Sequence, residues 1–164
     1  MLVDKDNNKR SDIFNWLKEK QFSIYCIQDF HLSKEQENSI ETEWGYTCVF
    51  SSYKTNARGT VILFNNNFEF KINKTKTDTN GNLVAIDLTC VEQRFTLISI
   101  YGPNEDNVPF FLDLKQIILE FNNSSVCICG DWNLVLDYSI DTKGYKTQNN
   151  PKARKQVLQM MEEI

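Results

Sequence analysis

Polar residues with chemical uses follow three apolar runs of the chain, where strands are expected to end. Asp29 follows the first run, Tyr101 and Asn104 follow the second, and Asp131 and Asn133 follow the third. Functional side chains collect at strand ends, because the ends of neighbouring strands meet at one edge of a sheet. These positions are therefore the first candidates for a site.

Asp131 and Asn133 form the pair with the clearest chemical use. They lie two residues apart after the apolar run Val126–Cys129, and in extended backbone both side chains would share one side with Trp132 on the other. An aspartate can orient a water and an asparagine amide can donate to a phosphate oxygen, which suits hydrolysis of a phosphoester. The competing structural interpretation, which spacing alone favours, is a turn in which Asp131 caps backbone amides.

The other candidates each have a functional and a structural interpretation. Asp29 could ligate a hard cation such as Mg²⁺, which needs only one or two protein carboxylates, or it could cap a helix or face solvent. The hydroxyl of Tyr101 could contact a phosphate, or its ring could belong to the core. His31 is the only histidine, and its place beside Phe30 predicts a partly buried loop residue rather than a general base.

Composition places the chain among globular proteins. Its 164 residues are 41% hydrophobic and 24% charged, which predicts one domain with a core. The net charge of −4 and the pI near 5.1 are opposite to the basic surface of a protein that holds DNA mainly by neutralising phosphates. Any contact with nucleic acid is therefore expected to be local or assisted by a metal.

The termini and the cysteines predict an intracellular protein, nuclear or cytoplasmic, without disulfides. The first ten residues have no apolar core, so they are not a signal peptide, and the apolar runs are too short to cross a membrane. The five cysteines include no CxxC spacing and read as reduced thiols of the core. With a single histidine, a zinc site is not expected.

Apolar periodicity predicts helices on both sides of a strand-rich middle, and hence a layered α/β sandwich rather than an all-parallel sheet. The expected helices are Ser11–Lys20, Ser33–Trp44 with a capping box, Val108–Phe121, and one opening at Asn150-Pro151 whose apolar side is Val157, Leu158, Met161 and Ile164. The expected strands are Phe22–Gln28, Tyr46–Phe50, Gly59–Phe64, Phe68–Ile72, Leu83–Thr89, Phe95–Tyr101 and the buried run Val126–Cys129, with Asn80-Gly81 as a hairpin turn.

Taken in order, the motifs resemble the endonuclease/exonuclease/phosphatase superfamily. They are most similar to the apurinic-type endonuclease domain of LINE-type (non-LTR) retrotransposons. The resemblance covers nearly the whole chain and is carried by Ile13–Leu17, Ser23–Gln28, Arg58–Phe64, Tyr101–Asn104 and Gly130–Asn133. It implies a DNase I-like, four-layered α/β sandwich. Residues 1–164 would form a single partial domain, truncated at both ends.

The resemblance also implies an activity, which is cleavage of a phosphodiester in double-stranded DNA with Mg²⁺ or Mn²⁺. The nick would supply a 3′ hydroxyl for a reverse transcriptase domain of the same polyprotein, if the native chain is longer. By position, Asp131 would orient the attacking water, Asn133 would hold the phosphate, Tyr101 would contact it, and Asp29 would bind the metal. The expected DNA contacts are Asn104, Arg58, Lys143 and Lys146.

Three departures from the family pattern predict a weakened or inactive fragment. Asp29 stands where the family has Glu, which withdraws the carboxylate by about 1.5 Å. The Asn-bearing first strand and the C-terminal Ser-Asp-His stretch are missing from the sequence. One alternative is a non-catalytic remnant that binds DNA or a protein through a basic segment, although a solvated face is the simpler interpretation of those charges: Lys143, Lys146, Lys152, Arg154 and Lys155. Another is a phosphodiesterase of the same superfamily acting on a lipid or inositol phosphate.

Overall fold

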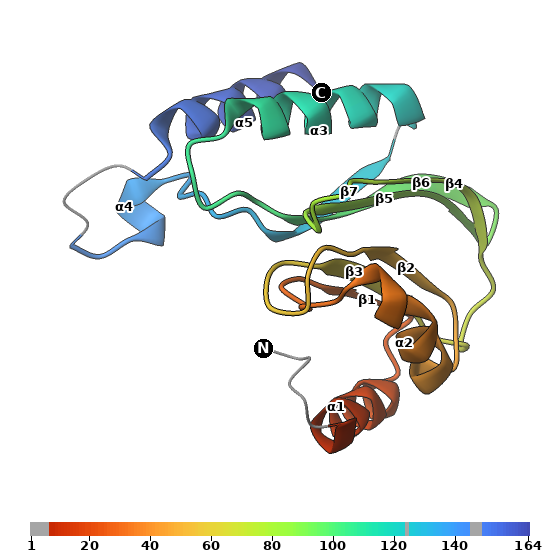
Figure 1. Cartoon of the computed structure of the whole chain (residues 1–164). Coiled ribbons are helices and arrows are strands. Elements are labelled where there is room, and N and C mark those ends of the chain that lie inside the picture. The colour runs from red at the N-terminus through yellow and green to blue at the C-terminus, as the bar shows by residue number, and fades with distance from the viewer. Residues whose placement is uncertain (1–6, 124, 145–148) are drawn as a thin grey trace. The chain divides into compact units, whose positions relative to one another are not determined.

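The computed structural model describes residues 7–123, 125–144 and 149–164, which form two compact units. The first unit comprises the chain up to Tyr101 together with Asn123–Asp131, and it holds both β-sheets (Figure 1). The second comprises Gly102–Asn122 and Trp132–Ile164 and is helical.

The helices are α1 Asn7–Lys20, α2 Glu37–Trp44 preceded by the 3₁₀ turn η1 Lys34–Gln36, α3 Val108–Phe121, α4 Tyr138–Asp141 and α5 Pro151–Glu163. The strands are β1 Ile24–Ile27, β2 Cys48–Ser51, β3 Thr60–Phe64, β4 Lys71–Thr77, β5 Leu83–Cys90, β6 Gln93–Tyr101 and β7 Val126–Asp131.

In the first unit, α1 and α2 cover one face of the antiparallel sheet β1-β3-β2 (Figure 1). The cluster that holds this layer includes Phe14 from α1 and Trp44 from α2, both almost fully buried. The predicted capping box at Ser33 is present and Gly45 ends α2 at φ 84°. Helix α1 begins a turn before the predicted Ser11, and the guanidinium of Arg10 in this added turn is buried against Glu43.

The other face of this sheet packs on the second sheet, whose strand order is β4-β5-β6-β7 (Figure 1). Ile62 and Phe64 of β3 meet Ile86 and Leu88 of β5 in the core between the sheets. Strands β4, β5 and β6 are antiparallel, whereas β6 and β7 are parallel. Helices and two sheets thus build three layers of the first unit.

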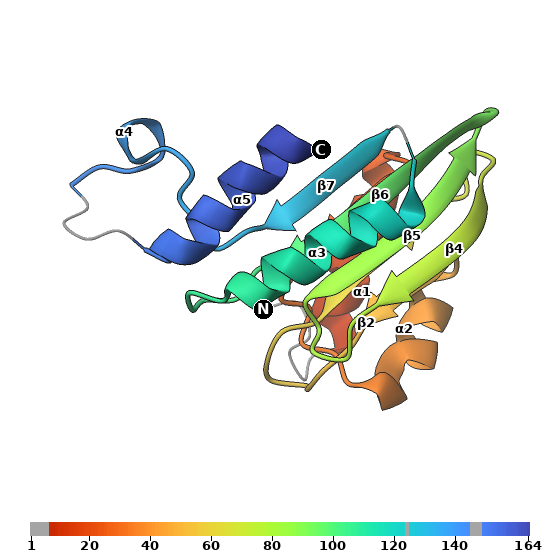
Figure 2. The ribbon, with the colours of Figure 1, turned by 90° about the horizontal axis from the view of Figure 1, so that it is seen from above.

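Two predicted strands differ from the structure. The expected strand Phe68–Ile72 is displaced to β4, Lys71–Thr77, because the rings of Phe68 and Phe70 stack on Phe64 instead of joining a ladder. The run beginning at Val126 is a strand at the edge of the sheet (Figure 2). It is not a buried strand, because all its residues are half-buried or exposed.

In the second unit, α3 and α5 lie side by side (Figure 2). Lys115 of α3 pairs with Glu163 of α5, and Phe111 stacks on Trp132 with ring centroids 6.2 Å apart. The buried side of α5 is Ala153, Val157 and Met160, so the prediction for Val157 is confirmed. Met161 and Ile164 are exposed, so the predicted apolar side is displaced by about a sixth of a turn.

Candidate functional site

Asp29 lies in a tight loop that follows β1 and is fixed from both sides. Its neighbours Phe30 and Leu32 are buried in the core between α1, α2 and the three-stranded sheet. The backbone N–H of Phe30 donates to the carbonyl of Gly59 at 2.9 Å, and that of His31 donates to the carbonyl of Arg58 at 2.6 Å. The loop therefore has little freedom, although Asp29 itself stays partly exposed.

This loop requires a glycine at position 59. Gly59 has φ +101°, and a Cβ there would lie 3.2 Å from the backbone nitrogen of His31 and 3.3 Å from that of Leu32. Asp29 and His31 also have positive φ, at 54° and 58°. Residues with side chains hold such angles only where the surroundings impose them, and such strain is often found at functional sites.

Tyr101 and Asp131 lie at the ends of the parallel strands β6 and β7, and they are register partners. Burial raises the pKa of the Tyr101 hydroxyl, and the carboxylates of Asp29 and Asp131 raise it further, while Arg58 lowers it. Three sequence-predicted residues of the first unit, Asp29, Asp131 and Arg58, therefore lie within electrostatic range of the hydroxyl of the fourth, Tyr101. The tyrosine stays protonated at neutral pH and can donate a hydrogen bond.

Sequence reasoning missed Asn82, which joins this group. Its side chain donates to the backbone carbonyl of Tyr101 and accepts from the guanidinium of Arg58 at 3.4 Å. The backbone N–H of Tyr101 donates in turn to the carbonyl of Asn82 at 2.7 Å. Its only sequence signal is its position directly after the Asn80-Gly81 turn. The hydrogen bonds of its side chain explain why this polar residue can be buried.

The sequence-predicted Asn133 and Asn104 belong to the second unit. Within it, the side chain of Asn133 donates to the carbonyl of Gly102 at 2.7 Å. The buried Asn150 donates to the backbone carbonyls of Asn104 at 3.4 Å and of Asn133 at 3.2 Å. One asparagine thus connects the two predicted motifs of this unit.

Two predictions about these asparagines are wrong in detail. Asn133 has φ 50°, so the backbone is not extended beyond the end of β7 at Asp131. Asn150 precedes α5 as predicted, but its side chain makes no capping hydrogen bond. The carboxylate of Asp106 caps the helix instead, by accepting from the backbone nitrogens of Lys152 and Ala153. The side-chain amide of Asn150 instead donates to the loops that contain Asn104 and Asn133.

Asp29 is the predicted metal ligand, and its surroundings suit a hard cation held largely by water. No three His, Cys, Asp or Glu side chains converge as a metal site among residues 7–123, 125–144 and 149–164. Mg²⁺ does not need such a cluster, since it commonly binds through one or two carboxylates and keeps several waters. The side chain of Asp29 is 44% exposed, so one ligand position on it can face solvent.

The predicted basic contacts beyond α4 are not gathered by the structure. Lys143 is exposed, and Lys146 lies outside the described residues. Arg154 donates to the carbonyl of Leu136 and lies over the ring of Tyr138, so it serves the folding of its own unit. The alternative of a basic binding segment gains no support from these residues.

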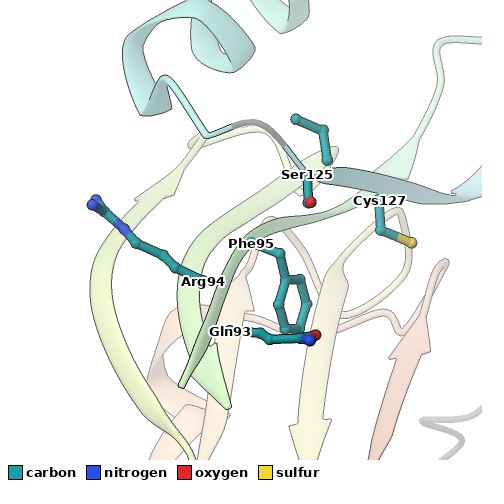
Figure 3. A pocket seen from close by; sticks show the side chains of 6 residues that line it. Gln93, Arg94, Phe95, Ser125 and Cys127 are labelled. Atoms are coloured by element: carbon teal, nitrogen blue, oxygen red, sulfur yellow. The ribbon is translucent and has the colours of Figure 1, made fainter. Parts of the chain in front are cut away.

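An open pocket of about 720 Å³ lies in the first unit at the starts of β6 and β7, opposite to the strand ends that carry Tyr101 and Asp131 (Figure 3). It is lined by Gln93, Arg94, Phe95, Ser125, Val126 and Cys127. Its position separates it from the candidate site.

Comparison with known proteins identifies solved structures that share this fold. No family model matches the chain. The Transposon TX1 uncharacterized 149 kDa protein of Xenopus laevis is 23% identical to it over 145 residues. An AP endonuclease from Archaeoglobus fulgidus superposes with a TM-score of 0.67 at 20% identity, covering 95% of this chain. The endonuclease domain of TRAS1, a telomere-specific non-LTR retrotransposon, superposes with a TM-score of 0.62 at 14% identity, covering 98% of this chain.

The chain has the fold of the endonuclease/exonuclease/phosphatase superfamily. The predicted α/β class and DNase I-like fold are thereby confirmed. The chain spans 67% of the archaeal enzyme, 65% of the TRAS1 domain and 11% of the transposon protein.

Two further findings concern membrane-spanning helices and the cysteines. No helix in the described parts of the chain is long and apolar enough to span a membrane. Cys26, Cys48, Cys90, Cys127 and Cys129 are all free thiols.

Proposed function

We propose that the chain is the catalytic part of a divalent-cation-dependent endonuclease that hydrolyses a DNA phosphodiester bond, of the kind that nicks target DNA for retrotransposition. The observations that carry the proposal are the register pairing of Tyr101 with Asp131 and the electrostatic influence of Asp29, Asp131 and Arg58 on the Tyr101 hydroxyl. Two carboxylates, one guanidinium and a protonated hydroxyl at one edge of a sandwich suit the handling of a phosphate and a metal ion.

The proposed roles are those that the family resemblance implies for each residue. Asp131, exposed at the end of β7, orients and activates the attacking water. Tyr101 donates its proton in a hydrogen bond to the phosphate. Asn133, whose side chain donates to the carbonyl of Gly102, would contact a phosphate oxygen through its amide. Arg58 and Asn104 contact neighbouring phosphates of the DNA.

Asp29 would hold Mg²⁺ or Mn²⁺, and the ion would supply charge to neutralise the phosphate oxygens. Aspartate is one methylene shorter than the glutamate of the family pattern, so coordination through water is expected to replace part of the direct contact. The family pattern also includes a histidine that stabilises the phosphate. The single histidine here, His31, is bound to Asp29 at 3.0 Å and so does not take that role.

The similarity to a transposon protein and to a non-LTR retrotransposon endonuclease supports double-stranded DNA as the substrate. It also supports a polyprotein context in which a reverse transcriptase uses the nick.

The test is nicking of supercoiled plasmid by the chain, and by an extended version of it, in MgCl₂ or MnCl₂. Asp131→Asn is expected to reduce nicking by at least about 10²-fold, and EDTA to abolish it. Asp113→Asn, which changes an exposed aspartate of α3, is the matched control and should nick as the parent does. Equal nicking by Asp131→Asn would refute the proposal. Duplex binding without nicking by either version would favour the non-catalytic alternative.

A further inference from the structure

His31 is a histidine for which the proposed roles have no use, yet it is built into the loop of the candidate metal ligand. Its side chain is only 11% exposed, while that of Asp29 is 44% exposed, and Nε2 of the ring lies 3.0 Å from Oδ1 of Asp29. We infer that His31 is a positioning residue, which holds one oxygen of the Asp29 carboxylate so that the other faces a divalent cation. This inference rests on the proposed function.

The backbone supports this assignment, because the two side chains meet in a loop whose backbone angles are uncommon for their residue types. Asp29 and His31 both have left-handed φ angles, which residues other than glycine rarely adopt. Phe30 and Leu32, each 1% exposed, fix the loop on either side of the ring. The contact is therefore part of a rigid loop.

The hydrogen bond has a defined direction. The carboxylate oxygen can only accept, so Nε2 carries the proton and donates it to Oδ1. A carboxylate held in this way keeps Oδ2 as the atom with open ligand positions. For an aspartate that is one methylene short of the usual glutamate, fixing the orientation limits the loss of metal affinity, because Mg²⁺ tolerates little error in its 2.0–2.1 Å oxygen distances.

The partner of a ligating carboxylate typically changes metal affinity by about 10- to 100-fold when it is removed. We therefore expect His31→Phe, which keeps the ring and deletes the donor, to raise the Kd for the cation by that factor. His31→Gln places an amide N–H near the position of Nε2 and should restore the greater part of the affinity. Leu32→Val is the matched control, since it trims a buried side chain of the same loop without touching the carboxylate.

The experiment measures binding of MnCl₂ by electron paramagnetic resonance and of MgCl₂ by calorimetry, on the full chain at a temperature where thermal melting shows each variant folded. Asp29→Asn provides the reference for loss of the ligand, and His31→Phe should add nothing in that background. A melting temperature that falls in Leu32→Val with unchanged Kd, beside a weakened Kd in His31→Phe, supports the inference.

Two results would overturn the inference, and they are distinguishable. If Asp29→Asn weakens cation binding while His31→Phe leaves it unchanged, the histidine has no positioning role and the proposed function is unaffected. If cation binding does not depend on Asp29, the metal assignment in the proposed function fails and the role of His31 fails with it.

Discussion

Tyr101 and Asp131 stand opposite each other in register at the ends of the parallel strands β6 and β7. The two motifs that contain them are 30 residues apart in the sequence, so the sheet alone brings the hydroxyl and the carboxylate together. Any change that displaces the end of β7 from β6 should therefore affect the site directly.

Gly130, the residue before Asp131, is where this arrangement is most sensitive. It has φ +128°, and a Cβ there would overlap the carbonyl oxygen of its register partner Ile100. Gly130→Ala is expected to reduce the free energy of unfolding by about 2–4 kcal/mol, from backbone strain together with overpacking. Urea denaturation measures the loss.

Gly45→Ala is the matched control for this prediction. Gly45 also has positive φ, at +84°, but a Cβ there meets nothing within 4 Å. It should cost only about 1 kcal/mol, which is the price of the backbone angle. Equal losses in the two variants would show that the contact with Ile100 is unimportant.

Much of the local structure could be predicted from the sequence, because its signals act over a few residues. The capping box at Ser33 and the stop at Gly45 fix the ends of one helical segment, and the turn at Asn80-Gly81 joins β4 to β5. The strand-end candidates Asp29, Tyr101 and Asp131 were found by the same local reasoning, and the sheets place them in one unit.

The remainder depends on contacts between residues far apart in the sequence. The cap of α5 comes from Asp106 rather than Asn150, and Arg10 in the first turn of α1 binds Glu43 of α2. Asn82 joins the candidate site only through its bonds to Arg58 and Tyr101. No spacing rule predicts such partners, because each contact forms only when segments that are distant in the sequence pack together.

Asp87 predicts a pH dependence of stability. This carboxylate is 1% exposed, and Arg94 donates to it with Nε at 2.9 Å and Nη2 at 2.6 Å. These bonds, with others from Asn73 and Asn123, lower the pKa of Asp87 below its ordinary value. Its contribution to stability is therefore complete above the unfolded-state pKa near 4 and is lost as the pH falls through the lower folded-state value.

Arg94→Met should therefore lower the free energy of unfolding at pH 7, because a buried carboxylate loses charged donors. The difference from the parent should shrink below about pH 4, as Asp87 becomes protonated. Urea denaturation between pH 3 and pH 7 measures it. Lys115→Met is the control for an exposed ion pair, and should cost less than about 1 kcal/mol. A difference between Arg94→Met and the parent that grows on acidification would contradict the assignment.

Arg58 predicts the salt dependence of DNA binding. Its guanidinium is exposed beside the ring of Tyr53, and it lies within electrostatic range of the Tyr101 hydroxyl. If it contacts one phosphate, Arg58→Gln should reduce the slope of log K against log salt concentration by about 0.9 for duplex DNA. Lys71→Gln removes an exposed charge from β4 and should leave the slope unchanged. The measurement is duplex binding by fluorescence anisotropy in calcium or EDTA, where no nicking interferes.

Replacing Asn150 tests whether its hydrogen bonds hold two loops of the second unit together. Its amide reaches the carbonyls of Asn104 and Asn133, and its φ of 47° is an angle that glycine adopts freely. Asn150→Gly therefore removes the hydrogen bonds without adding strain, and should cost about 1–2 kcal/mol in urea denaturation. Asn122→Gly is the matched control, because Asn122 is exposed at φ 50° after α3, where glycine is favoured. Because Asn133 is proposed to hold the phosphate, Asn150→Gly should also raise the KM for plasmid nicking, whereas Asn122→Gly should leave it unchanged. Similar stability and KM in both variants would mean that Asn150 does not hold the two loops together.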